Sequence, residues 1–243
     1  MLENIDINRM NRLMQENSEA KSIITQLIKN HHTDVSMIAH EIRNPLTLVS
    51  SSLQVIEAQH PEVKEFYNWK QTMEDIQFMC RLLNELTTFN NSSTLHYSVF
   101  PIGGLLKNIA ISFAISLDSE DSEIRFSSRI SPELGEFTGD KVKLEEVVLN
   151  LLRNAKDAVK DNGVITLSAD KENSQIVIRC TDNGCGIPDD ETDRIFDPFF
   201  SHKEGGTGLG LSLSRRIVEA HRGTISVSSS HESGTVFTVT LPV

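Results

Sequence analysis

Apolar residues with helical spacing run through the first third of this 243-residue chain. One series extends over Ile24–Ile56 and a second over Phe66–Leu86, both in steps of three and four residues. This spacing is typical of helices that pack against other helices. Between the series lies Gln59–Pro61, where the proline ends a helix and biases the preceding residue toward extended geometry. The pattern therefore predicts a long helix over Ile5–Ala58 and a second helix over Phe66–Leu86, joined as an antiparallel hairpin.

The polar segment Asn90–Thr94 ends the helical region, and the pattern behind it becomes mixed. Alternating apolar residues predict strands, whereas apolar residues at every third or fourth position predict helices. The expected strands lie near residues 97–100, 124–128, 164–169, 176–181, 224–228 and 235–241, and the expected helices near residues 102–115, 141–159 and 208–221. Helices on one side of a mixed sheet form a two-layer α/β sandwich. The predicted fold class is α plus α/β, with a helical hairpin followed by this sandwich.

The predicted hairpin has one narrow apolar stripe and no further element to cover it. Pairing two hairpins into a four-helix bundle covers the stripes of both copies. Association of identical surfaces is also the commonest form of oligomer. We therefore expect a homodimer, in which the hairpin serves as the dimerisation domain.

Composition narrows the class of protein. The chain is 38% hydrophobic and 23% charged, which is ordinary for a globular protein, and its net charge of -11 argues against a nucleic-acid partner. The three cysteines form no even disulfide framework, so we expect reduced thiols in a cytoplasmic protein, with a redox pair of Cys180 and Cys185 as the lesser alternative. No apolar run approaches the ~18 residues that cross a bilayer, and no signal-peptide core is present, so we expect no membrane span.

His40 and Glu41 stand side by side within the first predicted helix, and Pro45 follows the histidine by five residues. His40 lies midway between Ile38 and Ile42 of the apolar series, so its side chain is expected to point away from the core. The proline removes a backbone donor and predicts a local distortion of the helix. These features suggest a reactive histidine rather than a packing residue. Taken alone, an ordinary polar residue on the outer face is the commoner case, and the other motifs of the chain reverse this preference. Too few residues precede His40 for a folded sensor domain, so we expect a signal from another chain, or a piece of a longer receptor.

Three further segments carry polar chemistry. Asn150 and Asn154 are four residues apart in a predicted helix and share one face, where amide oxygens suit Mg²⁺ together with a phosphate. Asp182 follows a predicted strand and can accept a hydrogen bond from an exocyclic amine such as that of adenine. The glycine-rich segment 205–210 opens the last predicted helix, whose free amide groups and dipole favour anions. The plainer interpretations are a solvated helix face for the asparagines and an ordinary Asn-Gly turn after Asp182.

An aromatic cluster stands just before the glycine-rich segment. It contains Phe199 and Phe200, and the basic residue Lys203 follows it. We expect the two phenylalanines to be partly core residues that anchor a lid while the glycines allow it to move. This would give the glycine-rich segment a hydrophobic hinge.

Five segments, taken together, resemble one protein family. HEIRNP, NLLRNA, DNGCGIP, FDPFF and GGTGLGL follow one another in this order. They closely resemble the phosphoacceptor, asparagine, glycine and phenylalanine boxes of the sensor histidine kinases of two-component signalling, over about residues 30–243. The resemblance implies a helical lead-in over residues 1–30, a dimerisation and histidine phosphotransfer domain over residues 31–91, a linker over residues 92–97 and a catalytic, Bergerat-type ATP-binding domain of the compact-lid branch over residues 98–243.

The resemblance also assigns roles to single residues. His40 matches the phosphoacceptor, Glu41 the base that makes its imidazole a better nucleophile, and Asn44 the position used in the reverse, phosphatase reaction. In the ATP-binding domain Asn154 would hold Mg²⁺, and Asn150 would assist at the phosphates. The further ATP-binding residues that the resemblance implies are Asp157, Asp182, Gly184, Gly186, Ile187, Lys203, Gly206, Thr207, Gly208, Leu209 and Gly210.

Within this set Asp182 would read the adenine, and Lys203 is the candidate for a contact with the γ-phosphate.

Three departures from the family pattern stand out. The lid between Phe200 and Gly206 is short, and Asp157 stands where many relatives carry lysine, so a carboxylate would face the phosphates unless metal or Lys203 intervenes. Related ATPases carry a glutamate where Asn150 stands, so this site is expected to hold ATP without rapid hydrolysis.

The sequence therefore predicts an ATP-dependent protein histidine kinase that phosphorylates His40. Its partner would be a response regulator, whose receiver aspartate takes the phosphoryl group and from which the same protein would remove it. One alternative is a catalytically weak phosphotransfer or adaptor dimer. Such a protein would be expected to have lost residues of its glycine and asparagine boxes, which are intact in this sequence. Another is a superfamily ATPase acting as a chaperone or switch, which would not need His40 in a heptad hairpin.

Overall fold

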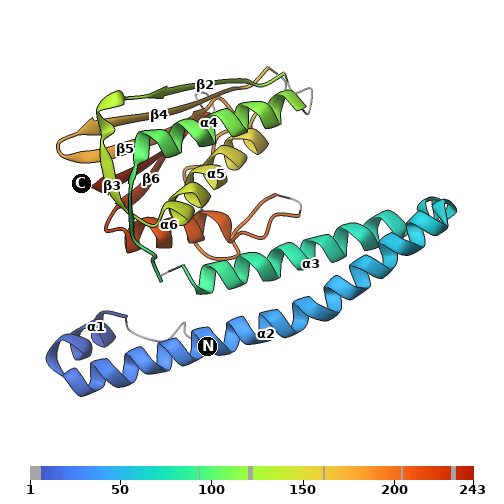
Figure 1. Ribbon diagram of the computed structural model, residues 1–243, viewed down its shortest axis with the longest axis horizontal. Coiled ribbons are helices and arrows are strands. Elements are labelled where there is room, and N and C mark those ends of the chain that lie inside the picture. Colours follow the sequence, from blue (N-terminus) through green and yellow to red (C-terminus); the bar gives the residue numbers. More distant parts are fainter. Residues whose placement is uncertain (1–6, 93, 120–122, 161, 204, 231–233) are drawn as a thin grey trace. The chain divides into compact units, whose positions relative to one another are not determined.

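A computed structural model describes residues 7–92, 94–119, 123–160, 162–203, 205–230 and 234–243, without the side chains of residues 7–11, 28, 29, 31 and 32. The chain forms two compact units, Met1–Asn91 and Ser92–Val243. The first unit is helical, and the second combines a mixed sheet with helices (Figure 1). This confirms the predicted class, a helical region followed by a sheet-and-helix domain.

The long first helix of the prediction is interrupted. The structure has α1 over Ile7–Glu16 and α2 over Ser18–Gln59. Asn17 lies between them with extended backbone, and its side chain accepts hydrogen bonds from the amide groups of Glu19 and Ala20 at 2.9 and 3.1 Å. An asparagine in this role satisfies the free amide groups of a new helix and so favours a break. The predicted start at Ile5 lies outside the described residues.

The second long helix begins later than predicted. A short 3-10 helix, η1 over Pro61–Glu65, follows α2, and α3 spans Trp69–Asn90. Phe66 has an extended backbone and is 62% exposed, so the prediction that it opens the helix is wrong. The proline at the first position of η1 fixes a tight turn before the chain reverses. At this end of the hairpin Trp69 Nε1 donates to Glu57 Oε2 at 2.9 Å.

Polar side chains tie α2 to α3 on both sides of His40. Arg43 Nη2 donates to the Leu83 carbonyl at 3.2 Å and to Thr87 Oγ1 at 2.9 Å. Asn90 Nδ2 donates to Ser36 Oγ at 3.1 Å. These contacts between distant residues fix the register of the two helices more specifically than apolar packing alone, because each needs one geometry.

Helix α2 continues through Pro45, and its apolar stripe stays open in the single chain. Ile38, Ile42, Val49 and Ile56 are between 40% and 52% exposed. A row of exposed branched side chains on one face differs from the scattered apolar residues of an ordinary surface.

The second unit contains a five-stranded sheet and a two-stranded sheet. In the larger sheet the order is β2-β4-β5-β7-β6, with β2 parallel to β4 and every other pair antiparallel. In the smaller sheet β1 pairs antiparallel with β3, a strand that the sequence pattern did not predict. The strands span Ser98–Pro101 (β1), Arg125–Ile130 (β2), Glu136–Gly139 (β3), Val164–Glu172 (β4), Gln175–Asp182 (β5), Thr224–Ser230 (β6) and Gly234–Pro242 (β7).

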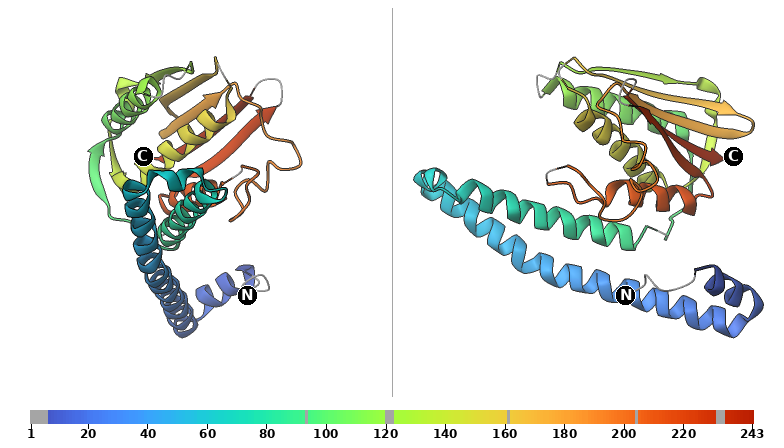
Figure 2. Two further views of the ribbon diagram at one scale, coloured as in Figure 1. Left: turned by 90° about the vertical axis from the view of Figure 1, so that its right-hand side faces the viewer. Right: turned by 180° about the vertical axis from the view of Figure 1, so that it is seen from behind.

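Three helices cover one face of the larger sheet, as predicted for a two-layer sandwich (Figures 1 and 2). They are α4 over Ile102–Ser119, α5 over Lys141–Ala158 and α6 over Gly210–Ala220, and a short 3-10 helix, η2, spans Pro132–Leu134. Alternate residues of the strands point toward these helices, so that Ile165, Leu167 and Ala169 of β4 are fully buried.

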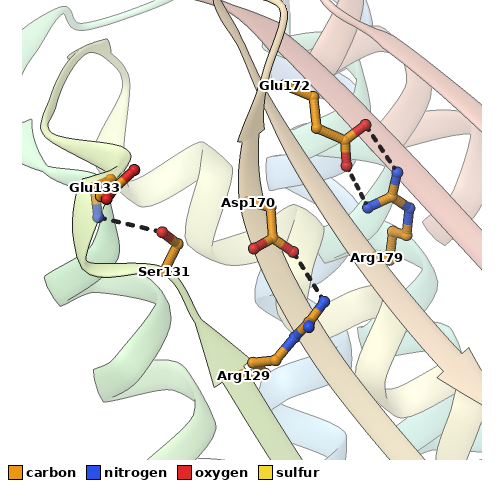
Figure 3. A network of polar contacts seen from close by, with 6 residues as sticks. All are labelled: Arg129, Ser131, Glu133, Asp170, Glu172 and Arg179. Carbon is orange, nitrogen blue, oxygen red and sulfur yellow. Dashed lines mark hydrogen bonds and ion pairs between the residues drawn. The ribbon is translucent and has the colours of Figure 1, made fainter.

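The other face of the sheet carries polar residues and ion pairs across the strands. Figure 3 shows Arg129 of β2 paired with Asp170 of β4 at 3.1 Å, and Arg179 of β5 paired with Glu172 of β4 at 2.8 and 3.2 Å. Nearby, Ser131 Oγ accepts from the Glu133 amide group at the start of η2. Exposed pairs of this kind contribute little stability, so the sheet is held by the buried face.

Among the described residues, α4 is the helix long and apolar enough, by length and composition alone, to cross a membrane. Its 18 residues have a mean hydropathy of 1.2. The sequence pattern predicted no span here, and Lys107 and two glycines interrupt the apolar residues of this helix. Leu106, Ile109 and Phe113 are buried within this unit, as in the core helix of a sandwich.

We predict that Arg43→Ala destabilises the helical unit by about 1–3 kcal/mol, because two hydrogen bonds from a charged donor are lost. The measurement is the midpoint of urea unfolding followed by circular dichroism. Arg81→Ala, at an exposed position of α3, is the matched control and should change stability by no more than about 0.5 kcal/mol. Equal midpoints for the two variants would show that Arg43 does not hold the hairpin together.

Candidate nucleotide-binding site

Helix α5 positions the two asparagines. Asp140 caps its N-terminus by accepting from the Lys143 amide group at 3.2 Å. The apolar face of the helix is buried, and Asn150 and Asn154 lie half-buried on its border. The buried residues are Leu144, Val147, Val148, Leu151, Leu152 and Ala155.

Asn150 joins α5 to the start of α6. Its Nδ2 donates to Ser214 Oγ at 2.9 Å, and Ser214 Oγ donates to the Gly210 carbonyl at 3.0 Å. A methyl group on Gly210 would overlap with Asn150 Oδ1. The glycine therefore allows the two helices to approach closely at this point. Ser214 was not a predicted site residue, and the only signal in the sequence is a serine within an otherwise apolar helix face.

Lys203 brings the segment before α6 onto the same face of α5. Its Nζ lies 3.0 Å from Asn154 Oδ1 and 2.9 Å from Asp157 Oδ2. The side chains of Lys203 and Asp157 are 44% and 54% exposed, so solvent screens this ion pair. The structure thus brings together three predicted residues, with an ammonium group on the amide oxygen assigned to Mg²⁺.

Asp182 lies buried at the end of β5. Its Oδ1 accepts from the Gly184 amide group at 2.8 Å, and the backbone of Thr235 in β7 also donates to the carboxylate. Burial raises the pKa of Asp182 above its ordinary value, against the opposing effect of these two amide groups and of Lys203. A desolvated carboxylate in this position is a strong acceptor for an N–H group of a ligand.

The turn after Asp182 requires glycine. A side chain on Gly184 would place its Cβ 2.6 Å from the Ala158 carbonyl oxygen, at the end of α5. Gly186 has a φ of 73°, which favours glycine. The turn is then tied to the sheet, because the Ile187 amide group donates to Ser229 Oγ at 2.8 Å.

The glycine-rich segment, residues 205–210, connects Lys203 to the start of α6. Gly206 donates through its amide group to the Lys203 carbonyl at 3.0 Å, which turns the chain back. Gly208 has a φ of 69°, and a Cβ there would lie 2.6 Å from the backbone nitrogen of Phe200. Thr207 Oγ1 accepts from the Leu209 amide group at 3.4 Å, and Leu209 is fully buried at the start of α6.

The aromatic residues differ in part from the prediction. Phe199 is 63% exposed with a φ of 66°, because its amide group is held by the Gly208 carbonyl, so its assignment to the core is wrong. Phe200 is half-buried and lies under Arg194 at 4.6 Å. Phe196 makes the contact with the sheet, edge to face with Phe237 at 6.5 Å between ring centroids.

A cation at this site would depend on few protein ligands. Among the described residues, no three His, Cys, Asp or Glu side chains gather as a metal site. Asn154 Oδ1 already contacts a cation, the Lys203 ammonium group, and an amide oxygen is a hard donor. This fits a Mg²⁺ ion held by one protein oxygen and completed by phosphate and water.

The predicted phosphoacceptor region lies in the helical unit. His40 is exposed on α2, and Asn44 Nδ2 lies 3.5 Å from His40 Nδ1, one turn away. Within the described residues no hydrogen bond joins Glu41 to His40. The imidazole is therefore accessible, with an amide rather than a carboxylate at its side.

Residues 139–243 match the family described as histidine kinase-, DNA gyrase B- and HSP90-like ATPases. The chain is 32% identical to sporulation kinase C of Bacillus subtilis over 98% of its own length and 53% of that protein, and 32% identical to the sensor histidine kinase ZraS of Escherichia coli K12, over 97% and 50%. It thus spans about half the length of the curated relatives that it matches.

Two solved structures are also similar. Full-length ShkA in complex with AMPPNP aligns with a TM-score of 0.73 and 23% identity over 86% of this chain and 45% of that one, which shows a shared fold. The catalytic domain of the histidine kinase ThkA aligns with a TM-score of 0.55 and 28% identity over 60% of this chain and 95% of that one.

We predict that Gly210→Ala weakens the binding of an ATP analogue at least tenfold, or about 1.4 kcal/mol, because the new methyl group displaces Asn150. Isothermal titration calorimetry measures the affinity. Gly104→Ala in α4 is the matched control, since its Cβ would meet nothing closer than 3.6 Å and the change favours a helix. Unchanged affinity in Gly210→Ala would show that the position of Asn150 does not matter for the nucleotide.

Proposed function

We propose that the C-terminal unit is the ATP-binding domain of a sensor histidine kinase and that the protein is an ATP-dependent histidine kinase that phosphorylates itself on His40; the family match of residues 139–243 and the similarity to sporulation kinase C and ZraS support this proposal. The observation that carries the proposal is the exposed imidazole of His40, in the HEIRNP segment, on the helix that precedes this domain. We assign residues 31–91 to dimerisation and phosphotransfer and residues 98–243 to catalysis, with residues 92–97 as the linker.

The site described above suits ATP. Asp182 would accept a hydrogen bond from the adenine amine, while Gly184, Gly186 and Ile187 form the turn beside the base. Asn150 and Lys203 would contact the phosphates, together with amide groups of the segment 206–210. These donors favour a triphosphate because a lysine and backbone amide groups at the start of a helix offset its charge.

A Mg²⁺ ion held by Asn154 would neutralise charge on the transferred phosphoryl group. Within the protein, the imidazole nitrogen of His40 would attack the γ-phosphorus, ADP would leave, and Glu41 would take the imidazole proton. The phosphoryl group would then pass from the histidine to an aspartate carboxylate of a response regulator. That acyl phosphate would also be the substrate of a phosphatase reaction.

We further propose a homodimer as the working form. The exposed stripe of α2, which includes Ile38, Ile42 and Val49, fits the same stripe of a second copy in a four-helix bundle. We also propose that the reaction takes place in the cytoplasm, where reduced thiols such as that of Cys80 persist.

Incubation with radiolabelled ATP tests the proposed function, since phosphohistidine is labile to acid and stable to alkali. We predict that His40→Gln abolishes such label but leaves ATP affinity nearly unchanged, because the histidine and the nucleotide site lie in different units. Asn154→Ala should also lose the label, because a ligand for Mg²⁺ is removed. Label that survives in His40→Gln would refute the assignment of the phosphoacceptor, and an unlabelled wild type would favour an adaptor.

We predict opposite defects for the two neighbours of His40. Asn44→Ala should keep autophosphorylation and lose phosphatase activity, because its amide can position a water molecule but is too far from the imidazole, at 3.5 Å, to hold it firmly. Glu41→Ala should lose autophosphorylation. Both reactions are followed with the cognate regulator, and equal loss of both in Asn44→Ala would mean that Asn44 is structural.

A further inference from the structure

A buried histidine outside the nucleotide site has no part in the proposed reaction. His221 follows α6 directly and is 5% exposed. Its Nδ1 lies 2.8 Å from the Ile217 carbonyl oxygen, and its Nε2 lies 2.9 Å from the backbone nitrogen of Asp140. This side chain therefore joins the end of α6 to the start of α5.

Both contacts fix one protonation state of the ring. A carbonyl oxygen can only accept, so Nδ1 must carry the proton. The Asp140 amide group can only donate, so Nε2 must be bare. The hydrogen bonds of the buried ring are thus satisfied by the neutral Nδ1–H form, and a second proton on Nε2 would face a backbone N–H group.

Asp140, which His221 holds through its backbone amide group, also binds the segment before β1 through its carboxylate. While its N–H group is held by His221, Oδ1 accepts from the Lys143 amide group and Oδ2 accepts from the His96 amide group at 2.8 Å. Asp140 is 4% exposed; its bond to His221 is buried, and its bonds to the His96 and Lys143 amide groups are partly buried. One aspartate therefore binds the first turn of α5, the C-terminal end of α6 and the segment before β1.

Further contacts fasten the segment before β1, residues 94–97, to the same place. Lys143 Nζ donates to the Thr94 carbonyl at 2.6 Å, and the Tyr97 ring lies 6.1 Å from the His221 ring. Gly139 leaves room for the imidazole, because a Cβ there would lie 2.9 Å from His221 Cδ2. Residues 94–97 lie near the start of the second unit, directly before β1.

The charges around His221 act in both directions. Burial lowers the pKa of His221 below its ordinary value of 6.5, Lys143 lowers it further, and Asp140 and the Ile217 carbonyl raise it. The segment before β1 adds the imidazole of His96, whose side chain is exposed, and Glu219 of α6 and Arg222 after it are exposed as well. At neutral pH the ring is therefore uncharged.

The sign of the pH effect follows from this shift. A histidine with a lowered pKa in the folded state binds fewer protons there than in the unfolded chain. Its contacts are complete above about pH 6.5, and the stability that they supply falls as the pH drops from there toward the folded-state pKa.

We propose that neutral His221 is the positioning residue that fastens residues 94–97 to α5, the helix that carries Asn150 and Asn154, and that protonation of its Nε2 releases this segment. The proposal rests on the proposed function only in treating α5 as the helix that carries nucleotide-binding residues. The fastening itself concerns the hydrogen bonds of the Asp140 and His96 amide groups.

The test is amide hydrogen exchange at His96 and Asp140 in the full chain, read by nuclear magnetic resonance as protection factors over about pH 8 to about pH 4.5. In the wild type we expect protection at neutral pH and a loss of about tenfold or more on protonation. A long-range proton–nitrogen correlation spectrum should show His221 as the Nδ1–H tautomer. An Nε2–H tautomer at neutral pH would overturn the proposal.

Three variants separate the histidine from its surroundings. His221→Gln offers an amide oxygen to the Asp140 amide group and cannot titrate, so protection should persist over the whole pH range. His221→Leu removes the acceptor and should lose protection at every pH. His96→Gln keeps the backbone contact and removes the neighbouring imidazole, so it should retain the wild-type pH profile.

Two results would overturn the proposal: wild-type protection at His96 in folded His221→Leu, and an unchanged pH profile in His221→Gln. The second result decides the question even where the leucine variant fails to fold. Affinity for an ATP analogue is measured in parallel on the wild type. Its absence would refute the proposed function but leave the fastening by His221 standing.

Discussion

Burial of one face of α5 is the constraint on which the candidate site depends. Leu144, Val147 and Leu151 are at most 3% exposed against the sheet, which fixes the rotation of the helix about its axis. Because an α-helix turns once in about 3.6 residues, Asn150 and Asn154 then have one direction available, toward α6 and the segment before it. A rotation that moved them would expose apolar side chains and break the contacts of both amides, so the core positions the polar groups.

The sequence predicted the elements whose pattern is long and regular, and it failed where one local contact decides. Asn17 ends α1 because its side chain binds the next helix's amide groups, which outweighs a helical pattern that continues across it. Phe66 fits the start of the second apolar series but lies on the exposed turn before α3. Strand β3 has only four residues and gains its identity from pairing with β1, which no local pattern reveals.

The candidate site was predictable to a different extent. The turn after Asp182 and the glycine-rich segment could be recognised from the sequence, because glycine spacing and strand ends are local features. Which side chains meet was not predictable, since Lys203 reaches Asp157 across 46 residues and His221 reaches Asp140 across 81. Phe199 illustrates the same limit: its positive φ depends on a backbone contact with Gly208, and this contact turns an apparent core residue outward.

The ion pair of Lys203 explains how Asp157 can stand beside the proposed phosphate site. The carboxylate is compensated by the ammonium group, which also contacts Asn154 Oδ1. In the proposed reaction, Mg²⁺ and triphosphate arrive together, so the metal competes for the amide oxygen while the phosphate offers Lys203 more negative charge than one carboxylate does. Asp157 is half exposed and would be left to water, which costs little for a solvated charge. A weak, screened pair at this point is therefore suited to exchange, whereas a buried one would oppose the nucleotide.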